Sequence, residues 1–139
     1  MIHLDTNYLI GLLVKGSRQA LEVDGWLAAG ESLAASAIAW TEFLNGPLTA
    51  LDVGRAEAVL QSRIMPFGRA EAVLAADLFN GTGRRRGSRF DCLIAATAGV
   101  AQAYIATVNA ADFKPFVPYG VKLASALQPA PPPEVTPTS

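Results

Sequence analysis

Four acidic side chains are candidates for one site, because each lies beside a segment expected to form a strand or a helix. They are Asp5, Glu42, Asp91 and Asp112. Carboxylates about 4 Å apart repel one another by roughly 4 kcal/mol near a protein surface, so a group of them must take up protons or bind a cation. Hard oxygen ligands favour Mg²⁺ or Mn²⁺. With one histidine, His3, and one cysteine, Cys92, the chain offers no ligand set typical of zinc.

The chemistry that such acids suggest is hydrolysis with the help of a metal ion. Mg²⁺ held by one or two carboxylates keeps several of its water molecules. The ion makes such a water more acidic, so that the water can attack a phosphodiester, and it neutralises the charge that develops on the phosphate. The four acids are therefore typical of a site that could support attack of a metal-bound water on a phosphodiester.

Each acid by itself also has an ordinary structural explanation. Asp5 begins an Asp-Thr-Asn segment that could cap a helix, and Asp91 falls in a first helical turn, where an acid is favoured by the helix dipole. Glu42 could be a solvated helix residue and Asp112 a turn residue. The metal site is favoured because four separate elements each bring an acid toward one end of the expected sheet. The other acids, such as Glu22, are expected on the surface.

The elements that must position these acids alternate between short apolar strands and helices. Strands are expected at residues 2–4, 32–36, 104–107 and 121–123, with 63–67 as a short edge strand or an extended loop. Helices are expected at residues 8–14, 17–29, 38–45, 48–62, 69–80 and 88–102. This alternation predicts an α/β fold around a mostly parallel sheet. Loops at the carboxyl ends of parallel strands converge on one crevice, so Asp5 and the turn at residues 107–112 should meet.

Length and composition fit one globular domain of ordinary size. The chain has 139 residues and a formal net charge of −1, so no overall basic field draws it to nucleic acid. Residues 1–126 are expected to form the domain, and residues 127–139, rich in proline and threonine, a disordered tail. The first residues lack the pattern of a signal peptide, and no apolar run is long enough to span a membrane. With a single cysteine, these features lead us to expect a cytoplasmic protein.

Four segments resemble motifs of the PIN-domain family, and of its VapC-type toxins in particular. They are Leu4-Asp5-Thr6-Asn7, Thr41-Glu42-Phe43, Phe90-Asp91-Cys92-Leu93-Ile94-Ala95-Ala96 and Thr107-Val108-Asn109-Ala110-Ala111-Asp112-Phe113. Each motif alone is short, but their order and spacing match as well, over about residues 1–126. The resemblance implies a three-layer α/β/α sandwich with an acidic Mg²⁺ or Mn²⁺ site and endoribonuclease activity on single-stranded RNA.

The resemblance also implies roles for single residues and for partners. By position, Asp5, Glu42 and Asp91 would be the core metal ligands and catalytic acids, with Asn109 or Asp112 at the fourth place. An amide at Asn109 can still orient a water, but it lowers the negative charge of the site. The implied partner is an antitoxin of the VapB type, and a homodimer is the expected assembly.

Basic and hydroxyl side chains near the acids are expected to hold the substrate. The basic ones are Arg84, Arg85, Arg86 and Arg89, in and after a glycine-containing loop at residues 81–87 that is expected to be flexible. They could grip RNA phosphates, stay solvated, or receive acidic groups of an antitoxin. Thr6, Asn7 and Thr107 are the other expected substrate contacts, although Thr6 or Asn7 could instead cap the first helix.

Other functions stay open at this point. A PIN-like module that binds RNA or protein with little cutting is the main alternative, because Asn109 is neutral. DNA is a further possible substrate, since the sequence does not show which sugar is read. A phosphate-accepting receiver domain fits poorly, because Lys114 is followed directly by Pro115. Aromatic residues near the acids are expected to pack more than to stack on bases. These aromatic residues are Tyr8, Trp40, Phe43 and Phe90.

Overall fold

The centre of the molecule is a five-stranded sheet, and the computed structural model describes residues 1–127 of the chain. The strands lie in the order β3-β2-β1-β4-β5, and every neighbouring pair is parallel. Their bounds are β1 Ile2–Leu4, β2 Leu33–Ser36, β3 Ile64–Met65, β4 Tyr104–Ala106 and β5 Lys122–Leu123. The central strand β1 pairs with β2 on one side and with β4 on the other, so that His3 is in register with Ala34 and with Ile105.

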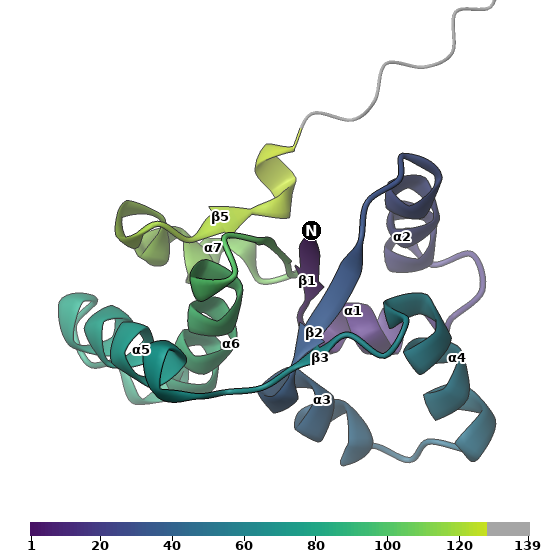
Figure 1. Ribbon diagram of the computed structural model, residues 1–139, viewed down its shortest axis with the longest axis horizontal. Helices are drawn as coiled ribbons and strands as arrows, with labels where there is room; N and C mark the ends of the chain where they lie inside the picture. The colour runs from purple at the N-terminus through teal and green to yellow at the C-terminus, as the bar shows by residue number, and fades with distance from the viewer. Residues whose placement is uncertain (128–139) are drawn as a thin grey trace, which may run out of the picture.

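Helices cover both faces of this sheet, with α5 and α6 on one side and α1, α2 and α4 on the other (Figure 1). The α-helices are α1 Thr6–Gly11, α2 Arg18–Ala28, α3 Ala37–Leu44, α4 Ala50–Leu60, α5 Arg69–Gly81, α6 Arg89–Val100 and α7 Ala110–Phe113. Three short 3₁₀ turns are η1 Arg86–Ser88, η2 Lys114–Tyr119 and η3 Ala124–Ala126. The expected α/β/α sandwich with a parallel central sheet is therefore confirmed.

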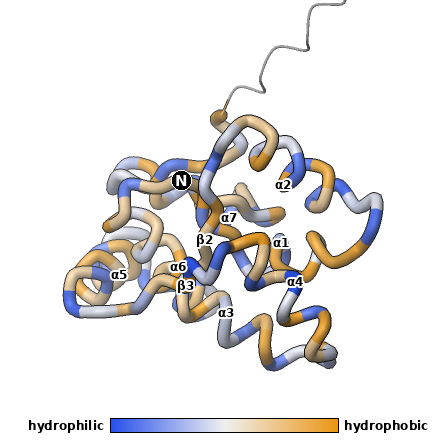
Figure 2. The backbone as a smooth tube through the Cα atoms, turned by 45° about the vertical axis from the view of Figure 1, so that its right-hand side comes forward, coloured by the Kyte–Doolittle hydropathy of each residue, from blue (hydrophilic) through white to orange (hydrophobic). Residues whose placement is uncertain are grey.

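The sheet forms the core because its strands are apolar on both faces. Every residue of β1 and of β2 is buried, as expected for a parallel sheet that helices cover on each side. Large side chains that are fully buried around it are Phe43, Leu60, Leu78, Ile94, Phe113 and Phe116. Helices α2 and α4 alternate between hydrophobic and hydrophilic residues along the chain (Figure 2), which is typical of helices with one face toward a core.

Several boundaries differ from the sequence-based expectation. The first helix begins at Thr6 because Asp5 is its N-cap residue and accepts a hydrogen bond from the Thr6 backbone, so neither Thr6 nor Asn7 has that part. Part of the loop at residues 81–87 belongs to α5 and η1. Helix α7 was not expected, because four residues are too few to show a helical period.

Among residues 1–127, no helix combines the length and apolar character needed to cross a bilayer. Of the expected tail at residues 127–139, all but Leu127 lies outside the described residues.

A buried histidine occupies the middle of the sheet. The side chain of His3 is 1% exposed, and neither ring nitrogen has a hydrogen-bond partner within the described chain. Burial, helped by the positive N-terminus, lowers the pKa of His3 to about 4. The imidazole is therefore neutral at pH 7 and packs as part of the core.

We expect the variant His3→Leu to lose part of the acid sensitivity of folding. A histidine in an unfolded chain titrates near pH 6.5, whereas the folded protein keeps His3 neutral down to about pH 4. Only the unfolded state takes up this proton in that range, so the free energy of unfolding falls as the pH drops below about 6.5. For this group alone the loss is about 2 kcal/mol at pH 5.

Urea unfolding of both proteins at neutral pH and at about pH 5 measures this difference. The carboxyl groups contribute to both proteins alike, so the comparison isolates the histidine. The same acid-induced loss of stability in wild type and variant would contradict the assignment.

Candidate functional site

Asp5 is fixed at the carboxyl end of the central strand. Its backbone N–H donates to the carbonyl of Ala106 in β4 (2.9 Å), which extends the sheet by one residue. Its side chain is only 5% exposed, and Oδ1 accepts a hydrogen bond from the backbone N–H of Thr6 (2.8 Å). The same carboxylate therefore caps α1 and faces the end of the sheet where the strands stop.

Hydrogen bonds tie this carboxylate to the loop that follows β4. Thr107 Oγ1 donates to Asp5 Oδ2 (2.8 Å) and itself accepts from the backbone N–H of Asn109 (3.1 Å). Asn7 Nδ2 donates to the same Asp5 oxygen (3.4 Å), and Asn7 Oδ1 accepts from the backbone N–H of Val108 (3.3 Å). Thr107 and Asn7, expected as substrate contacts, are thus engaged in orienting Asp5 and the β4–α7 loop.

Glu42 joins the group from the next helix. It lies on α3, half-buried, and its Oε1 accepts a hydrogen bond from Thr6 Oγ1 (3.1 Å). Thr6 belongs to the first turn of α1, so three successive residues, 5 to 7, contribute the side-chain bonds that organise the site. Thr6 also has its hydroxyl directed at an acid rather than left free for a ligand.

Asp91 shows that the acids share one electrostatic environment. It stands in the first turn of α6, half-buried. Burial raises its pKa to about 6, and the negative charges of Asp5, Asp112 and Glu42 add to the rise, while Arg85 opposes it. All four acids that the sequence singled out are therefore close enough to affect the same carboxyl group.

Burial and hydrogen bonding act on Asp5 in opposite directions. Burial raises its pKa and is the larger effect, while hydrogen bonds from Thr107, from the Thr6 backbone and from Asn7 oppose the rise. These donors favour the ionised form and so offset part of the cost of burying a carboxylate.

The two candidates for the fourth position differ in their coupling to the other acids. Asn109 is exposed and precedes α7 without a side-chain capping bond, whereas Asp112 lies on α7 and its charge reaches Asp91. Asp112 is therefore the candidate whose charge acts on Asp91, since the side chain of Asn109 is neutral.

The donor set fits a hard divalent cation by its chemistry. Its side chains are carboxylates: burial, and then repulsion from the other acids, raises the pKa of Asp91, and a cation would relieve that repulsion. Within residues 1–127, no three histidine, cysteine, aspartate or glutamate side chains converge closely enough to enclose one ion as they stand. The pKa shift and the geometry thus differ, because charge acts over longer distances than ligation. The shift indicates that the acids share one electrostatic field, whereas these side chains, as they lie, do not enclose an ion.

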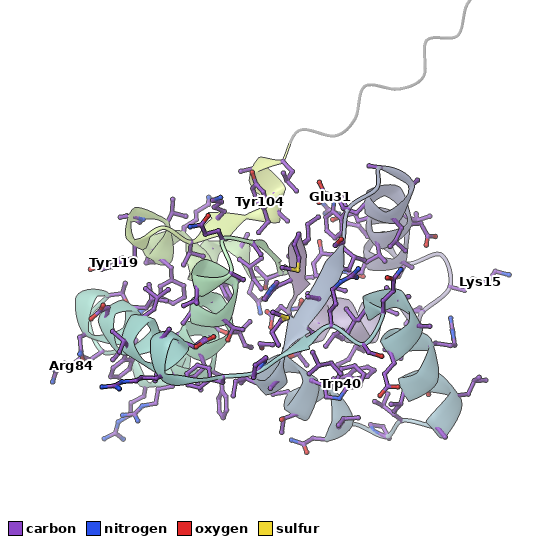
Figure 3. The ribbon with its side chains drawn as sticks, in the orientation of Figure 1. Lys15, Glu31, Trp40, Arg84, Tyr104 and Tyr119 are labelled. Carbon is purple, nitrogen blue, oxygen red and sulfur yellow. The ribbon has the colours of Figure 1, made fainter. Side chains whose placement is uncertain are left out.

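The arginine cluster divides into two parts. Arg84, Arg85 and Arg86 are exposed in the turn before α6, and Figure 3 shows Arg84 at the outer edge beside α5. Arg85 is the member that acts on the acids, since it lowers the pKa of Asp91. Arg89 instead places its guanidinium over the ring of Phe79, 5.0 Å from the ring centre.

Three of the four aromatic residues near the acids pack inside the protein, and one does not. Tyr8, Trp40 and Phe43 are buried, as expected, but Phe90 is 59% exposed.

Glu22 is not a simple surface acid, because it accepts hydrogen bonds from the Tyr8 hydroxyl and from Arg18, both 2.8 Å. The pair of Arg18 and Glu22 is four residues apart on α2, but the bond from Tyr8 was not visible in the sequence, because Tyr8 lies on α1.

The family model of the PIN domain matches residues 2–114, and no curated protein matches the chain significantly in sequence. A toxin–antitoxin complex from Klebsiella pneumoniae is 25% identical, with a TM-score of 0.65 over 82% of this chain and 91% of that one. FitAcB from Neisseria gonorrhoeae is 23% identical, with a TM-score of 0.63 over 88% and 96%. VapBC2 from Rickettsia felis, bound to a promoter DNA fragment, is 22% identical, with a TM-score of 0.62 over 88% and 97%. These structures share the fold.

We expect the Asp91 carboxyl group of the metal-free protein to titrate near pH 6. Replacing Asp5 by Asn removes one negative charge, so the pKa of Asp91 should fall in that variant. Carbon-13 NMR of the aspartate carboxyl groups measures both values. Asp24→Asn, on the exposed side of α2, is the matched control and should leave Asp91 unchanged. An Asp91 pKa that is insensitive to Asp5→Asn would show that the two acids do not share a site.

Proposed function

The chain belongs to the PIN-domain family, and on this basis we propose that it is an Mg²⁺- or Mn²⁺-dependent endoribonuclease acting as the VapC-type toxin of a toxin–antitoxin pair. Members of this family are generally nucleases. The single observation that carries the proposal is the buried Asp5 carboxylate at the carboxyl end of β1, with Glu42 joined to the same turn through Thr6. Burial, and then the charges of Asp5, Asp112 and Glu42, raise the pKa of Asp91 to about 6, which supports the grouping. Acids at the carboxyl end of a parallel sheet lie where such folds bind ligands.

The residues that would hold the metal ion are Asp5, Glu42 and Asp91. Asp112 is the preferred fourth group because its charge reaches Asp91, with Asn109 as the neutral alternative. When bound, the ion would acidify a water and neutralise charge on the phosphate.

The hydroxyl and amide neighbours would act by orienting the acids. Thr107 and Asn7 hold Asp5 Oδ2, and Thr6 holds Glu42. Groups of this kind fix the direction of a metal ligand and typically contribute about 10- to 100-fold to metal affinity or activity. Each could also contact the substrate, but only in addition to these bonds.

The exposed arginines would supply the phosphate contacts that an acidic site lacks. With a net charge of −1, the chain has no long-range attraction for a polyanion, so binding must rely on local charge. Arg84, Arg85 and Arg86 are exposed at the start of α6, the helix that carries Asp91. Single-stranded RNA is the expected substrate, since its phosphates can follow such a cluster without a groove for a duplex.

A protein partner is the second part of the proposal. The structures that resemble this chain include one described as a toxin–antitoxin complex and others described as VapBC. We infer that an antitoxin of the VapB type covers the acidic site of this chain and keeps it inactive in the cytoplasm. A homodimer is the proposed assembly of the toxin.

We expect purified protein with Mg²⁺ or Mn²⁺ to cut single-stranded RNA, and Asp5→Asn to lower the rate by at least about 100-fold. The reason is that groups which merely orient a metal ligand already contribute up to about 100-fold. Cleavage of labelled RNA and DNA oligonucleotides, with and without chelator, measures the effect and identifies the sugar. Asp24→Asn serves as the control.

Growth of cells that express the two variants gives the second readout. Wild type and Asp24→Asn should stop growth, and Asp5→Asn should not. The proposal is contradicted if the wild type cuts no RNA with either metal and cells grow equally well with the wild type and with Asp5→Asn. That result would favour a PIN-like module that binds RNA or protein without cutting it.

A further inference from the structure

A cavity of about 840 Å³ lies between α2, the carboxyl end of β4 and the turn η3. Its volume is within the range of about 300–1,000 Å³ that ligand sites occupy. Trp26 lines it from α2, Val108 from the loop after β4, and Leu127 from the end of η3. The cavity therefore adjoins two features: the loop that orients Asp5, and the point at which the described part of the chain ends.

The wall of the cavity offers aromatic and apolar surface. The rings of Tyr8 and Trp26 stack with their centres 5.8 Å apart, and Trp26 is half-buried. Val108 is 51% exposed although it is apolar. An occupant with apolar side chains would remove this surface from water, which is favourable in proportion to the apolar area that is covered.

The charges in the wall do not suit a polyanion. Two acids, Glu22 and Glu31, line the cavity together with one basic side chain, Arg18. Arg18 is already paired with Glu22 (2.8 Å), and Glu31 lies 3.5 Å from the amino group of Met1. RNA is therefore a poor occupant, because no unpaired positive charge in the wall is left for its phosphates.

The segment that follows Leu127 has a composition that suits such a wall. It contains one charged side chain, Glu134, and four prolines near its start, which are Pro129, Pro131, Pro132 and Pro133. Proline favours the polyproline II conformation, which has three residues per turn and no internal hydrogen bonds. Pro129 and Pro132 would share one face of it, and this is the spacing with which proline-rich segments dock into aromatic-lined grooves.

The segment also starts at the cavity itself. The backbone N–H of Leu127 donates to the carbonyl of Ala124 in η3 (2.9 Å), and Leu127 belongs to the wall. At about 3.1 Å per residue, Pro132 stays within roughly 16 Å of Leu127. A short tether of this kind gives an effective concentration in the millimolar range, so that a weak contact is enough to fill the cavity.

We propose that residues 128–139 bind in this cavity as an extended proline-rich segment. Pro129 and Pro132 would lie against the half-buried ring of Trp26, and the inference does not depend on the proposed function. The bound segment would also lie beside Thr107, which lines the same cavity and donates to Asp5. In this way the end of the chain supports the loop that orients the buried carboxylate.

The test is paramagnetic broadening in the full chain, with a nitroxide attached to the variant Val135→Cys. Cys92 is 1% exposed and is therefore shielded from the label. The indole N–H signals of the two tryptophans report the contact, because Trp26 lines the cavity whereas Trp40 lies on α3 outside it. We expect the signal of Trp26 to be lost and that of Trp40 to remain.

Two sets of variants in the labelled chain separate recognition from mere tethering. Serine in place of the four prolines keeps the length of the segment and should restore the Trp26 signal. Val108→Ser, which removes apolar surface from the wall, should restore it in part. The matched control is Val73→Ser, since Val73 is similarly exposed (58%) but lies on α5 outside the cavity, and there the signal should stay lost.

Two results with the labelled chain would overturn the proposal. One is a Trp26 signal that the label leaves unchanged, and the other is equal broadening with and without the prolines. A mixture of labelled chains with unlabelled ¹⁵N chains identifies the source of the segment, and we expect no broadening in the ¹⁵N chains. Broadening of Trp26 in this mixture would assign the cavity to the segment of a second copy, which also contradicts the proposal.

Discussion

The burial of the Asp5 carboxylate at the end of the central strand is the constraint on which the rest of the site depends. A buried carboxylate is costly unless it is paired or hydrogen-bonded, and here Thr107, Asn7 and the Thr6 backbone supply the bonds. Two of these donors come from the residues directly after Asp5, and the third from the loop after β4. The hydrogen bonds to this one carboxylate therefore join the start of α1 to the loop after β4. The same loop leads into α7, where Asp112 lies close enough for its charge to act on Asp91.

Acidic and basic side chains both lie at the start of α6. The negative charges of three other acids help to raise the pKa of Asp91, and Arg85 partly offsets this rise. Arg89 instead lies over the ring of Phe79. In the proposed function the exposed arginines let a polyanion approach while the acids stay free for a cation. The chain achieves it with a net charge of only −1, because both kinds of charge are local.

The sequence was sufficient to predict a mostly parallel sheet and to single out the four acids, because apolar strands and acids after them are local signals. It did not predict the strand order, which depends on contacts between distant segments. It could not reveal that Thr6 holds Glu42, since residues 36 positions apart in the chain meet only in the folded protein. Nor did it choose among Asp5, Thr6 and Asn7 as the cap of α1, because all three are residue types found at N-caps. The exposure of Phe90 was also missed, since neighbours in the Asp91 motif face different sides of one helix.

The central claim is that these acids form one site for a divalent cation, and calorimetric titration of the full chain with Mg²⁺ or Mn²⁺ tests it most directly. The account expects binding to the wild type that is lost, or weakened by at least about 100-fold, in Asp91→Asn. A wild type that binds neither ion, or a variant that binds as well as the wild type, would contradict it.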